Sequence, residues 1–384
     1  MTEDVTAGPG RAQSFWFHLR PDPKLTGDRL RAQAARHRHI VLNAKDHGRL
    51  RDIRSGNPRA EVFVYKDISS TRSYACKDGV DEPYLPTGVG YCHADRHHRG
   101  WFLLDGKGER LRYQGYSGHW QMDVGRDDYL TCWVDDVVEE AGKLRFDGVY
   151  LDNALVAADD YHPGTVPAKY PTNALMQDAY ADALAHVHGR LGEKGLRVAA
   201  NIANARLHRG VWQRYVEHLD VGVDEWWVAL GKGNLLPDYA EGWRRQVEEI
   251  AHDEALGKGT WVQPHFPRED RRALWYSMAS YFLATGGHAM ITEIDRTDDH
   301  TTLPPERAVY GWDLGEPREA HHETAQGSGL FRRRFTRGLA LVNANKEGSR
   351  TVAVDGGHVD MDDRDVTSPV TLPALTGMVL RRKS

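Results

Sequence analysis

Residues 145–153 read Arg-Phe-Asp-Gly-Val-Tyr-Leu-Asp-Asn, and the fold can be worked out from this stretch. Large apolar side chains and a β-branched valine fill its middle, which predicts a short strand buried on both faces. The strand ends in an acid and an amide, Asp152 and Asn153. A carboxylate at such a tip lies between packed side chains and an open cleft, so the fold can tune its pKa and direct it at a substrate. The alternative is that Asp152 caps the next segment or pairs with a cation.

Strands and helices alternate on both sides of this stretch. Further strands are predicted at residues 14–19, 39–43, 60–67, 197–204, 221–227, 260–265 and 288–293, and helices at 26–38, 46–55, 127–143, 172–191, 211–219, 238–256 and 269–285. Eight strands separated by helices predict an α/β fold, the (β/α)8 TIM barrel. A doubly wound open sheet is the alternative, but such sheets often carry a glycine-rich first turn, and the chain has no G-x-G-x-x-G or P-loop motif.

Two regions depart from this alternation. An insertion at about residues 68–125, rich in Gly, Tyr, His and charge, follows the third strand, and a hairpin is predicted within it at 101–113. Insertions of this length in a compact domain are usually functional. From about Gly327 the pattern changes to short strands at 330–335, 338–343, 351–354, 370–372 and 378–380. We therefore expect a barrel over residues 1–326 and a small all-β domain over 327–384.

Composition and charge argue against several classes of partner. The net charge of −5 gives no basic excess to neutralise phosphates, which argues against nucleic acid. No apolar run approaches the roughly 20 residues of a membrane span, so no membrane partner is predicted. Residues 1–13 lack the features of a signal peptide, so we expect a cytoplasmic protein, or an exported one whose signal has been removed. The oligomeric state is not predicted.

The cysteines and a histidine-rich segment are the candidates for redox and metal chemistry. Cys76 and Cys92 bracket one loop and could form a disulfide, whereas Cys132 falls in a helical pattern typical of a buried free thiol. His97 and His98 are adjacent, and the histidines of segment 92–98 do not make up a complete zinc-ligand set, so a solvated loop is the favoured interpretation. No metal and no other cofactor is predicted.

The catalytic residues of a TIM barrel lie at the carboxyl ends of its strands. Glycoside hydrolysis needs two carboxylates roughly 5–9 Å apart. Asp152 on strand four and Glu225 on strand six would lie roughly opposite each other in an eight-stranded ring, and they are the predicted catalytic pair. Asp224 alternates to the other face of its strand and is the expected structural acid.

Other polar and aromatic strand ends are predicted to bind substrate. Amides and acids satisfy sugar hydroxyls, and flat aromatic rings stack on pyranose faces. The predicted set is Lys66, Asp67, Asn153, Asn201, Trp226, Trp227, His265 and Glu293. Asp67 and Glu293 are also reserve candidates for the second carboxylate, with ion pairs to Lys66 and Arg296 as the alternative. Strand alternation allows only one of the two tryptophans to face a sugar.

The strand-four segment, residues 146–153, resembles the signature of (β/α)8 glycosidases such as the endo-α-1,4-polygalactosaminidases and related uncharacterised glycosidase families. Shorter matches occur in the hairpin from Trp101, at residues 122–125 and at 310–317, and segment 331–343 resembles the β-sandwich that follows many such barrels. The resemblance implies an α-linked bond, with Asp152 as nucleophile or, in an inverting enzyme, as base, and Glu225 as general acid/base. The α-galactosidases and α-amylases also carry their nucleophilic Asp on strand four.

The chain departs from the α-amylase pattern on strand five. The α-amylases place their acid there, whereas this chain has Asn201 and Asn204, which argues against an amylase and leaves strand six as the source. We expect a glycoside hydrolase acting on an oligo- or polysaccharide, with carbohydrate as its partner. Two alternatives stay open: a carbohydrate-binding pseudoenzyme on the same barrel, and a metal-dependent barrel hydrolase using the histidines of 93–98.

Overall fold

A parallel sheet of eight strands forms the centre of the computed structural model, which describes residues 8–295, 300 and 303–383. Its order is β1-β2-β3-β8-β9-β10-β11-β12. The strands are β1 (Phe15–His18), β2 (His39–Leu42), β3 (Glu61–Asp67), β8 (Gly148–Asp152), β9 (Arg197–Asn201), β10 (Val221–Asp224), β11 (Gly259–Val262) and β12 (Met290–Ile291). Each predicted strand is present, and the (β/α)8 TIM-barrel class is confirmed.

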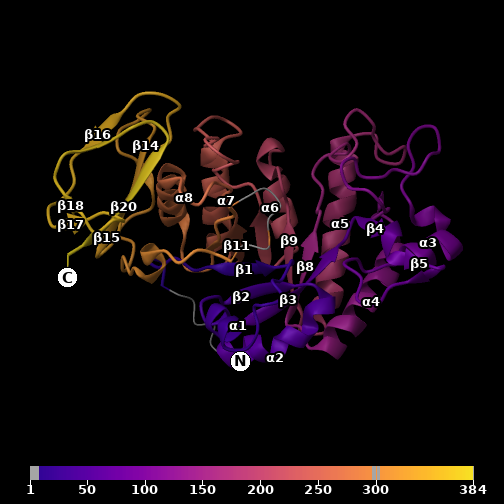
Figure 1. Cartoon of the computed structure of the whole chain (residues 1–384). Helices are drawn as coiled ribbons and strands as arrows, with labels where there is room; N and C mark the ends of the chain where they lie inside the picture. The colour runs from indigo at the N-terminus through magenta and orange to yellow at the C-terminus, as the bar shows by residue number, and fades with distance from the viewer. Residues whose placement is uncertain (1–7, 296–299, 301–302, 384) are drawn as a thin grey trace. The chain divides into compact units, whose positions relative to one another are not determined.

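Helices follow the strands as the apolar periodicity predicts. They are α1 (Gly27–Ala34), α2 (Leu50–Gly56), α4 (Asp127–Leu144), α5 (Asn173–Gly192), α6 (Val211–Val216), α7 (Trp243–Ala255) and α8 (Arg271–Ala284). The predicted helix at 46–55 is split, because a 3₁₀ segment, Ala44–Arg49, precedes α2. Helix α4 buries one stripe that includes Leu130, Trp133 and Val137, as a helix covering a sheet must. In Figure 1, α4 and α5 lie beside each other and flank the strands that they connect.

Packing divides the chain into two compact units, Trp16–Val223 and Met1–Phe15 with Asp224–Ser384. The first contains β2, β3, β8, β9 and the insertion. The second contains β11, β12, α7, α8 and the C-terminal strands. This division follows contacts between residues, whereas the expected boundary near residue 327 follows a change of secondary structure, and that boundary stays a prediction.

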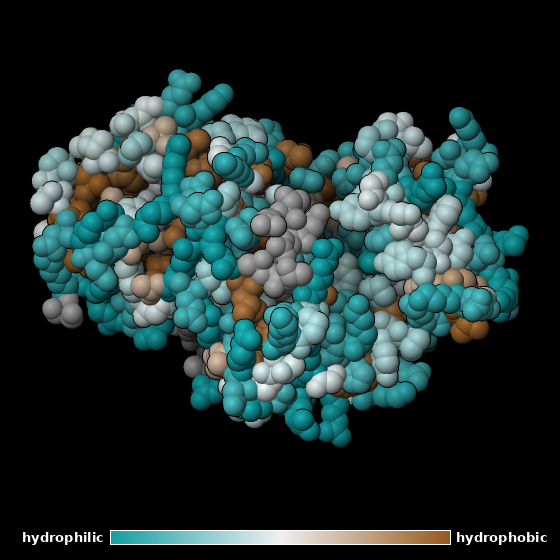
Figure 2. Space-filling model, viewed as in Figure 1, coloured by the Kyte–Doolittle hydropathy of each residue, from teal (hydrophilic) through white to brown (hydrophobic). Residues whose placement is uncertain are grey.

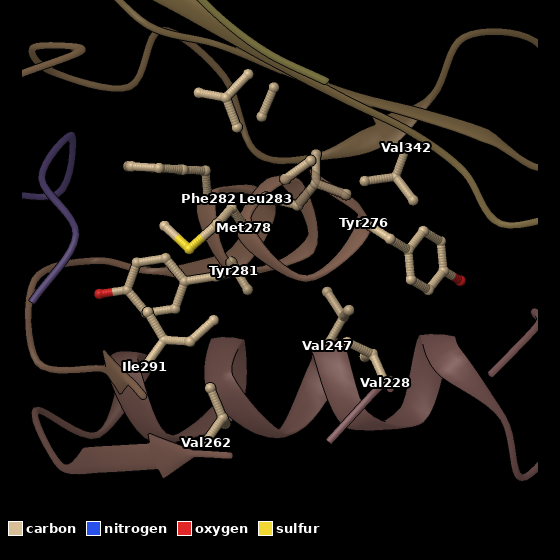
Figure 3. Packing of buried hydrophobic residues seen from close by; sticks show 14 of the residues in the cluster. Val228, Val247, Val262, Tyr276, Met278, Tyr281, Phe282, Leu283, Ile291 and Val342 are labelled. Atoms are coloured by element: carbon tan, nitrogen blue, oxygen red, sulfur yellow. The ribbon is translucent and has the colours of Figure 1, made fainter. Parts of the chain in front are cut away.

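The core of the second unit is built around α8. Every residue from Tyr276 to Ala284 is buried, because one side of the helix packs on α7 and the barrel strands and another on β15 (Gly338–Asn343) and β20 (Thr376–Arg382). Figure 3 shows Tyr276, Met278 and Tyr281 of this helix among aliphatic side chains from neighbouring elements. A helix buried on all sides has no polar stripe, which explains why its sequence is apolar around the whole circumference. Gly377 permits the approach of β20, since a Cβ there would lie 2.5 Å from the Trp275 carbonyl oxygen.

The C-terminal strands form two sheets, as the sequence predicts for a small all-β region. One has the order β13-β14-β15-β20-β17-β18, and the other pairs β16 with β19. The remaining strands are β13 (His322–Glu323), β14 (Leu330–Arg334), β16 (Arg350–Val352), β17 (His358–Val359), β18 (Asp365–Val366) and β19 (Val370–Leu372). Leu341 and Leu380 from the larger sheet share a buried cluster with Leu372 from the smaller one, which gives a sandwich-like core.

The insertion has a secondary structure of its own. It contains β4 (Ser70–Arg72), β5 (Cys76–Lys77), β6 (Val80–Asp81), α3 (Tyr91–His97) and β7 (His119–Gln121). Cys76 and Cys92 form a disulfide, and Cys132 is a free, partly buried thiol. The predicted hairpin is present as an isolated bridge between Leu104 and Arg110, with the Leu111 N–H donating to the Leu103 carbonyl at 2.9 Å, and its second arm also bridges to β7 through Arg112 and Trp120.

The surface is largely polar. On the face shown in Figure 2, hydrophilic side chains predominate and the hydrophobic patches are small. Among the residues with a described position, no helix combines the length and the apolar character needed to cross a membrane.

Candidate active site

The tip of β8 carries the predicted catalytic Asp152. The buried strand pairs in parallel with β3 on one side and β9 on the other, and this register puts Asp152 directly beside Asp67. Gly148 allows the close pairing at the start of the strand, because a Cβ there would lie 2.5 Å from the Phe63 ring. The sheet therefore brings two carboxylates together at the carboxyl ends of neighbouring strands.

Asp152 is partly exposed and is held on both carboxylate oxygens. The Tyr65 hydroxyl donates to Oδ2, while the Asn201 amide donates to Oδ1 at 3.2 Å and the Asn153 backbone N–H at 3.0 Å. Burial and the nearby charge of Asp67 raise the pKa of Asp152, and these effects outweigh the bonds from Tyr65 and Asn201, which favour the ionised form. The carboxylate is thus fixed in direction and is easier to protonate than an ordinary aspartate.

Asp67 has a different role from its neighbour. It has no exposed surface and accepts hydrogen bonds from six donors. Four come from the backbone N–H groups and hydroxyls of Ser69 and Ser70, at 2.6 to 3.3 Å, and the others from Asn153 at 2.9 Å and Arg72 at 3.4 Å. A carboxylate with its lone pairs used in this way orders the turn that follows β3. In this conformation Asp67 cannot touch a substrate, so it supports the site.

Asn153 links the two acids to the loop that follows β8. Its backbone is left-handed, with φ of 62°, which an asparagine tolerates better than most residues. This conformation lets its amide donate to Asp67 while its carbonyl oxygen accepts from the Tyr161 hydroxyl at 2.6 Å. Strained residues are enriched at functional sites, where the surrounding structure holds them in place.

Lys66 lies outside this group. Strand alternation directs it towards the helices, where its ammonium forms an ion pair with Glu140 of α4 and donates to the Leu85 carbonyl at 2.5 Å. Its side chain is buried. The sequence predicts Lys66 as a sugar ligand, whereas the structure pairs its buried ammonium with Glu140.

The strand ends of the second unit carry the other predicted residues. Asp224 is buried and accepts a 2.6 Å hydrogen bond from the Gln246 side chain of α7, so it holds a helix to a strand as expected of the structural acid. Glu225 follows β10 and is partly exposed. Trp227 is fully buried and donates to the Gln246 carbonyl, which leaves it no face for a sugar.

Trp226 and His265 form a stacked pair, with ring centroids 3.9 Å apart and an angle of 19° between the rings. Trp226 keeps partial exposure, whereas His265 is buried beneath it. Of the two predicted tryptophans, Trp226 is the one that retains a surface for stacking. His265 supports the indole ring.

Glu293 is paired with a cation. Its carboxylate lies 2.8 Å from Arg307 Nη2 and receives two further bonds from Nε of the same guanidinium. Burial raises the pKa of Glu293, although Arg307 opposes that shift. The alternative partner, Arg296, lies outside the described residues. A carboxylate held in this way is a poor second catalytic acid, but one of its edges remains a candidate for binding a hydroxyl.

The histidine segment of the insertion was predicted as a loop but forms helix α3, on which His93 and His97 lie one turn apart with ring centroids 5.5 Å from each other. His98 stacks on Trp101 with centroids 3.9 Å apart, and His93 lies 5.0 Å from the His98 ring. Within the described part of the chain, the one group of potential metal ligands that lie close together is Cys76, Asp81 and Cys92. Both of its sulfurs are in the disulfide, and the Asp81 carboxylate accepts from backbone N–H groups at the start of α3. These residues do not suit a metal ion.

Two residues at the site were not predicted from the sequence. Tyr65 holds Asp152 directly, and Arg72 donates to the Tyr65 hydroxyl and to Asp67, both at 3.4 Å. A signal for Tyr65 was present, because it lies two residues before Asp67 on the same face of β3. No comparable signal marks Arg72, which lies in the insertion.

A (β/α)8 barrel with a polar network and a partly exposed acid at the tip of its fourth strand is an arrangement found in barrel glycoside hydrolases. Residues 54–339 match the family model described as hypothetical glycosyl hydrolase family 15. The match covers most of the chain, and the chain belongs to this family. The protein is therefore a glycosidase.

Solved structures are similar at low sequence identity. The GH27 β-L-arabinopyranosidase of Geobacillus stearothermophilus gives a TM-score of 0.53 at 10% identity, covering 98% of this chain and 97% of that one. An α-amylase from Lactobacillus plantarum gives 0.52 at 12% identity, covering 98% and 99%. The glycoside hydrolase domain of PelA from Pseudomonas aeruginosa gives 0.47 at 16% identity, covering 77% and 99%. The first two show that the fold is shared. A comparison with curated proteins gives no match.

Proposed function

We propose that this glycosidase cleaves an α-linked bond in an oligo- or polysaccharide, with Asp152 and Glu225 as its catalytic carboxylates. The observation that carries the proposal is the state of Asp152: a partly exposed carboxylate at the carboxyl end of the fourth strand, oriented by Tyr65, Asn201 and the Asn153 backbone. Catalytic groups must be held in direction by their neighbours, and this one has three donors aimed at it.

Asp152 supplies the electron pair in this proposal. In a retaining reaction its carboxylate attacks the anomeric carbon and the bond to the leaving oxygen breaks; water then hydrolyses the glycosyl ester. In an inverting reaction it removes a proton from the attacking water. Either role needs the ionised form. Because the pKa of Asp152 is raised, activity is expected to fall on the acidic side at a higher pH than for an ordinary aspartate.

Glu225 supplies the proton for the leaving oxygen. It follows the sixth strand and is partly exposed, whereas the preceding Asp224 is buried and bonded to Gln246. Trp226, Asn201, Asn153 and one edge of Glu293 are proposed to contact sugar. Asp67, Trp227 and His265 are proposed to support these residues, and Lys66 to hold α4.

The two roles can be separated by changing the leaving group. Substrates would be 4-nitrophenyl α-glycosides of galactosamine, galactose and glucose, and unactivated α-1,4-linked oligosaccharides of galactosamine and glucose. D152N should lower kcat/KM on every cleaved substrate by about 10³-fold or more. E225Q should lower it by about 10²-fold or more on oligosaccharides but far less on nitrophenyl glycosides, because nitrophenolate leaves without a proton.

The exposed Asp182 of α5 offers a matched control, and D182N should retain full activity. NMR of the first-formed sugar anomer would tell retention from inversion. Full activity in D152N would contradict the proposal. Equal losses on both kinds of substrate in E225Q would remove Glu225 from the acid role. Saturable sugar binding without turnover by the unmodified chain would favour the pseudoenzyme.

A further inference from the structure

The insertion presents two exposed tyrosines on either side of a histidine. Tyr74 is 52% exposed and Tyr116 43% exposed, both high for aromatic rings. His119 lies between them, with its ring centroid 5.8 Å from that of Tyr74 and 5.5 Å from that of Tyr116. Three aromatic rings in a row at the surface have a cost in solvation, which suggests that something binds them.

The backbone that carries these rings is held by strand pairing and by turn hydrogen bonds. Strands β4 and β7 are antiparallel, with Arg72 opposite His119, and the Ser73 N–H donates to the Gly118 carbonyl at 2.8 Å. The loop between Tyr113 and His119 closes on itself, because the Tyr113 N–H donates to the His119 carbonyl at 3.0 Å. A platform that is already ordered loses little conformational entropy when a ligand binds.

Two chains of contacts join the rings to Asp152. Arg72 Nη1 donates to the Tyr74 hydroxyl at 3.0 Å, and Nη2 of the same guanidinium donates to Tyr65, which holds Asp152. On the other side, the Tyr116 ring meets Tyr161 edge to face at 5.7 Å, and the Tyr161 hydroxyl donates to Asn153. Tyr113 stacks beneath Tyr161 at 3.8 Å. The exposed rings therefore lie on the same framework as the proposed nucleophile or base.

We propose that Tyr74, Tyr116 and His119 form an aromatic platform that binds pyranose rings of the glycan chain cleaved at Asp152. The inference rests on the proposed function and specifies where the chain extends from the cleaved bond. The C–H faces of a pyranose match flat aromatic rings, and tyrosine adds a hydroxyl for the sugar edge. Burial and the charge of Arg72 lower the pKa of His119 to about 4, so at neutral pH its ring is uncharged and can both donate and accept a hydrogen bond.

The test measures binding in the full-length D152N variant, which is expected to bind without cleaving. The probes are maltoheptaose and an α-1,4-galactosamine oligosaccharide, titrated by calorimetry. Y74A and Y116A in this background should each raise Kd by roughly tenfold. Y74F and Y116F keep the ring and should change Kd less than about twofold, which also separates stacking from a folding defect. Y239A removes an exposed tyrosine of the other compact unit and should leave Kd unchanged.

Each outcome decides the proposal. A Kd in Y74A and Y116A equal to that of Y239A would overturn the platform, and so would a failure of D152N to bind either probe. The proposed function fails separately, if D152N still cleaves its substrate. A second readout uses catalysis by the otherwise unmodified enzyme. The alanine variants should raise KM for the oligosaccharide, with kcat on the matching nitrophenyl glycoside within about twofold, and equal losses on both would contradict a platform role.

Discussion

In the unit Trp16–Val223, acids at the amino ends of the strands are paired with cations, whereas acids at the carboxyl ends lie beside each other. At the amino end, Glu61 opens β3 and lies 2.7 Å from Arg197 and 3.1 Å from His39. Nearby, Asp147 lies 3.0 Å from Arg54 and accepts the Val62 N–H. At the carboxyl end, Asp152 has no such cation of its own, and its nearest charged neighbour in the sheet is another acid, Asp67.

The pKa values of the two acids move in opposite directions. Burial alone would raise the pKa of Glu61, but His39 and Arg197 outweigh it and lower the pKa to about 2. Burial and Asp67 raise the pKa of Asp152. The first arrangement stabilises the fold, and the second costs stability and makes the Asp152 carboxylate easier to protonate. In a (β/α)8 barrel the amino ends of the strands serve stability and the carboxyl ends catalysis. The opposite pKa shifts of Glu61 and Asp152 agree with that division.

The largest expected effect on stability comes from removing the ion pair of Glu61 at the amino end of β3. E61Q removes the partner of Arg197 and should lower the free energy of unfolding by about 2 kcal/mol at pH 7, with kcat unchanged. Because the folded pKa is lowered, this stabilisation is complete above the unfolded value near 4.5 and is lost as the pH falls towards 2. Urea unfolding at pH 7 and pH 4 would measure the difference between E61Q and the unmodified protein.

An exposed ion pair gives the matched control. D135N breaks the pair between Asp135 and Arg190, whose side chains are 58% and 38% exposed, and should cost less than about 0.5 kcal/mol. An E61Q variant no less stable than D135N, or one with reduced kcat, would contradict the assignment of this end to stability.

The sequence predicts the sheet more fully than the site. The buried stretch at 145–152 and the alternation of strands and helices specify β3, β8 and their neighbours, because apolar periodicity reflects burial directly. Asp152 and Asn201 follow from the same pattern, as ends of adjacent strands. Period-two alternation, which the grouping of Lys66 with Asp67 as sugar ligands did not take into account, puts Lys66 on the face opposite Asp67 and Tyr65, where it pairs with Glu140.

Contacts made between distant segments could not be predicted in this way. The aromatic platform depends on pairing of Ser70–Arg72 with His119–Gln121, across nearly fifty residues without a regular period. Glu293 pairs with Arg307, which lies 14 residues further along the chain. The burial of His265 beneath Trp226 likewise depends on packing between the segments that follow β10 and β11. Each of these is decided by tertiary structure, for which local pattern carries no signal.

Removing one hydrogen bond to Asp152 tests the pKa shift proposed for the carboxyl end of β8. Y65F deletes the hydroxyl that favours the ionised form of Asp152, so the pKa of this acid should rise further. The acidic limb of kcat/KM should therefore move to higher pH, with activity about fivefold lower at the acidic end and little changed at pH 8. A pH–rate profile on the best nitrophenyl glycoside would measure the shift.

The control for this variant is Y161F, which removes the hydroxyl that donates to the Asn153 side chain at 2.6 Å. Its acidic limb should stay where it is in the unmodified enzyme. If the acidic limb of the pH–rate profile moved equally in Y65F and Y161F, the shift would not come from the Tyr65 hydrogen bond to Asp152.

The smallest expected effect is a gain in stability in D152N, the variant that is expected to lose activity. The raised pKa means that folded Asp152 binds a proton more tightly than the unfolded chain does, so stability falls as the pH rises from about 4 through the folded pKa. D152N carries no such charge and should be more stable by about 0.5–1 kcal/mol at pH 7, with the advantage shrinking as the pH falls to 4. E61Q should show the reverse trend, losing its deficit at low pH. Thermal unfolding at several pH values could show that D152N is less stable than the unmodified protein, or that its advantage does not change with pH. In either case the ionised carboxylate of Asp152 would not destabilise the fold, and the contrast between the two ends of the strands would rest on Glu61 alone.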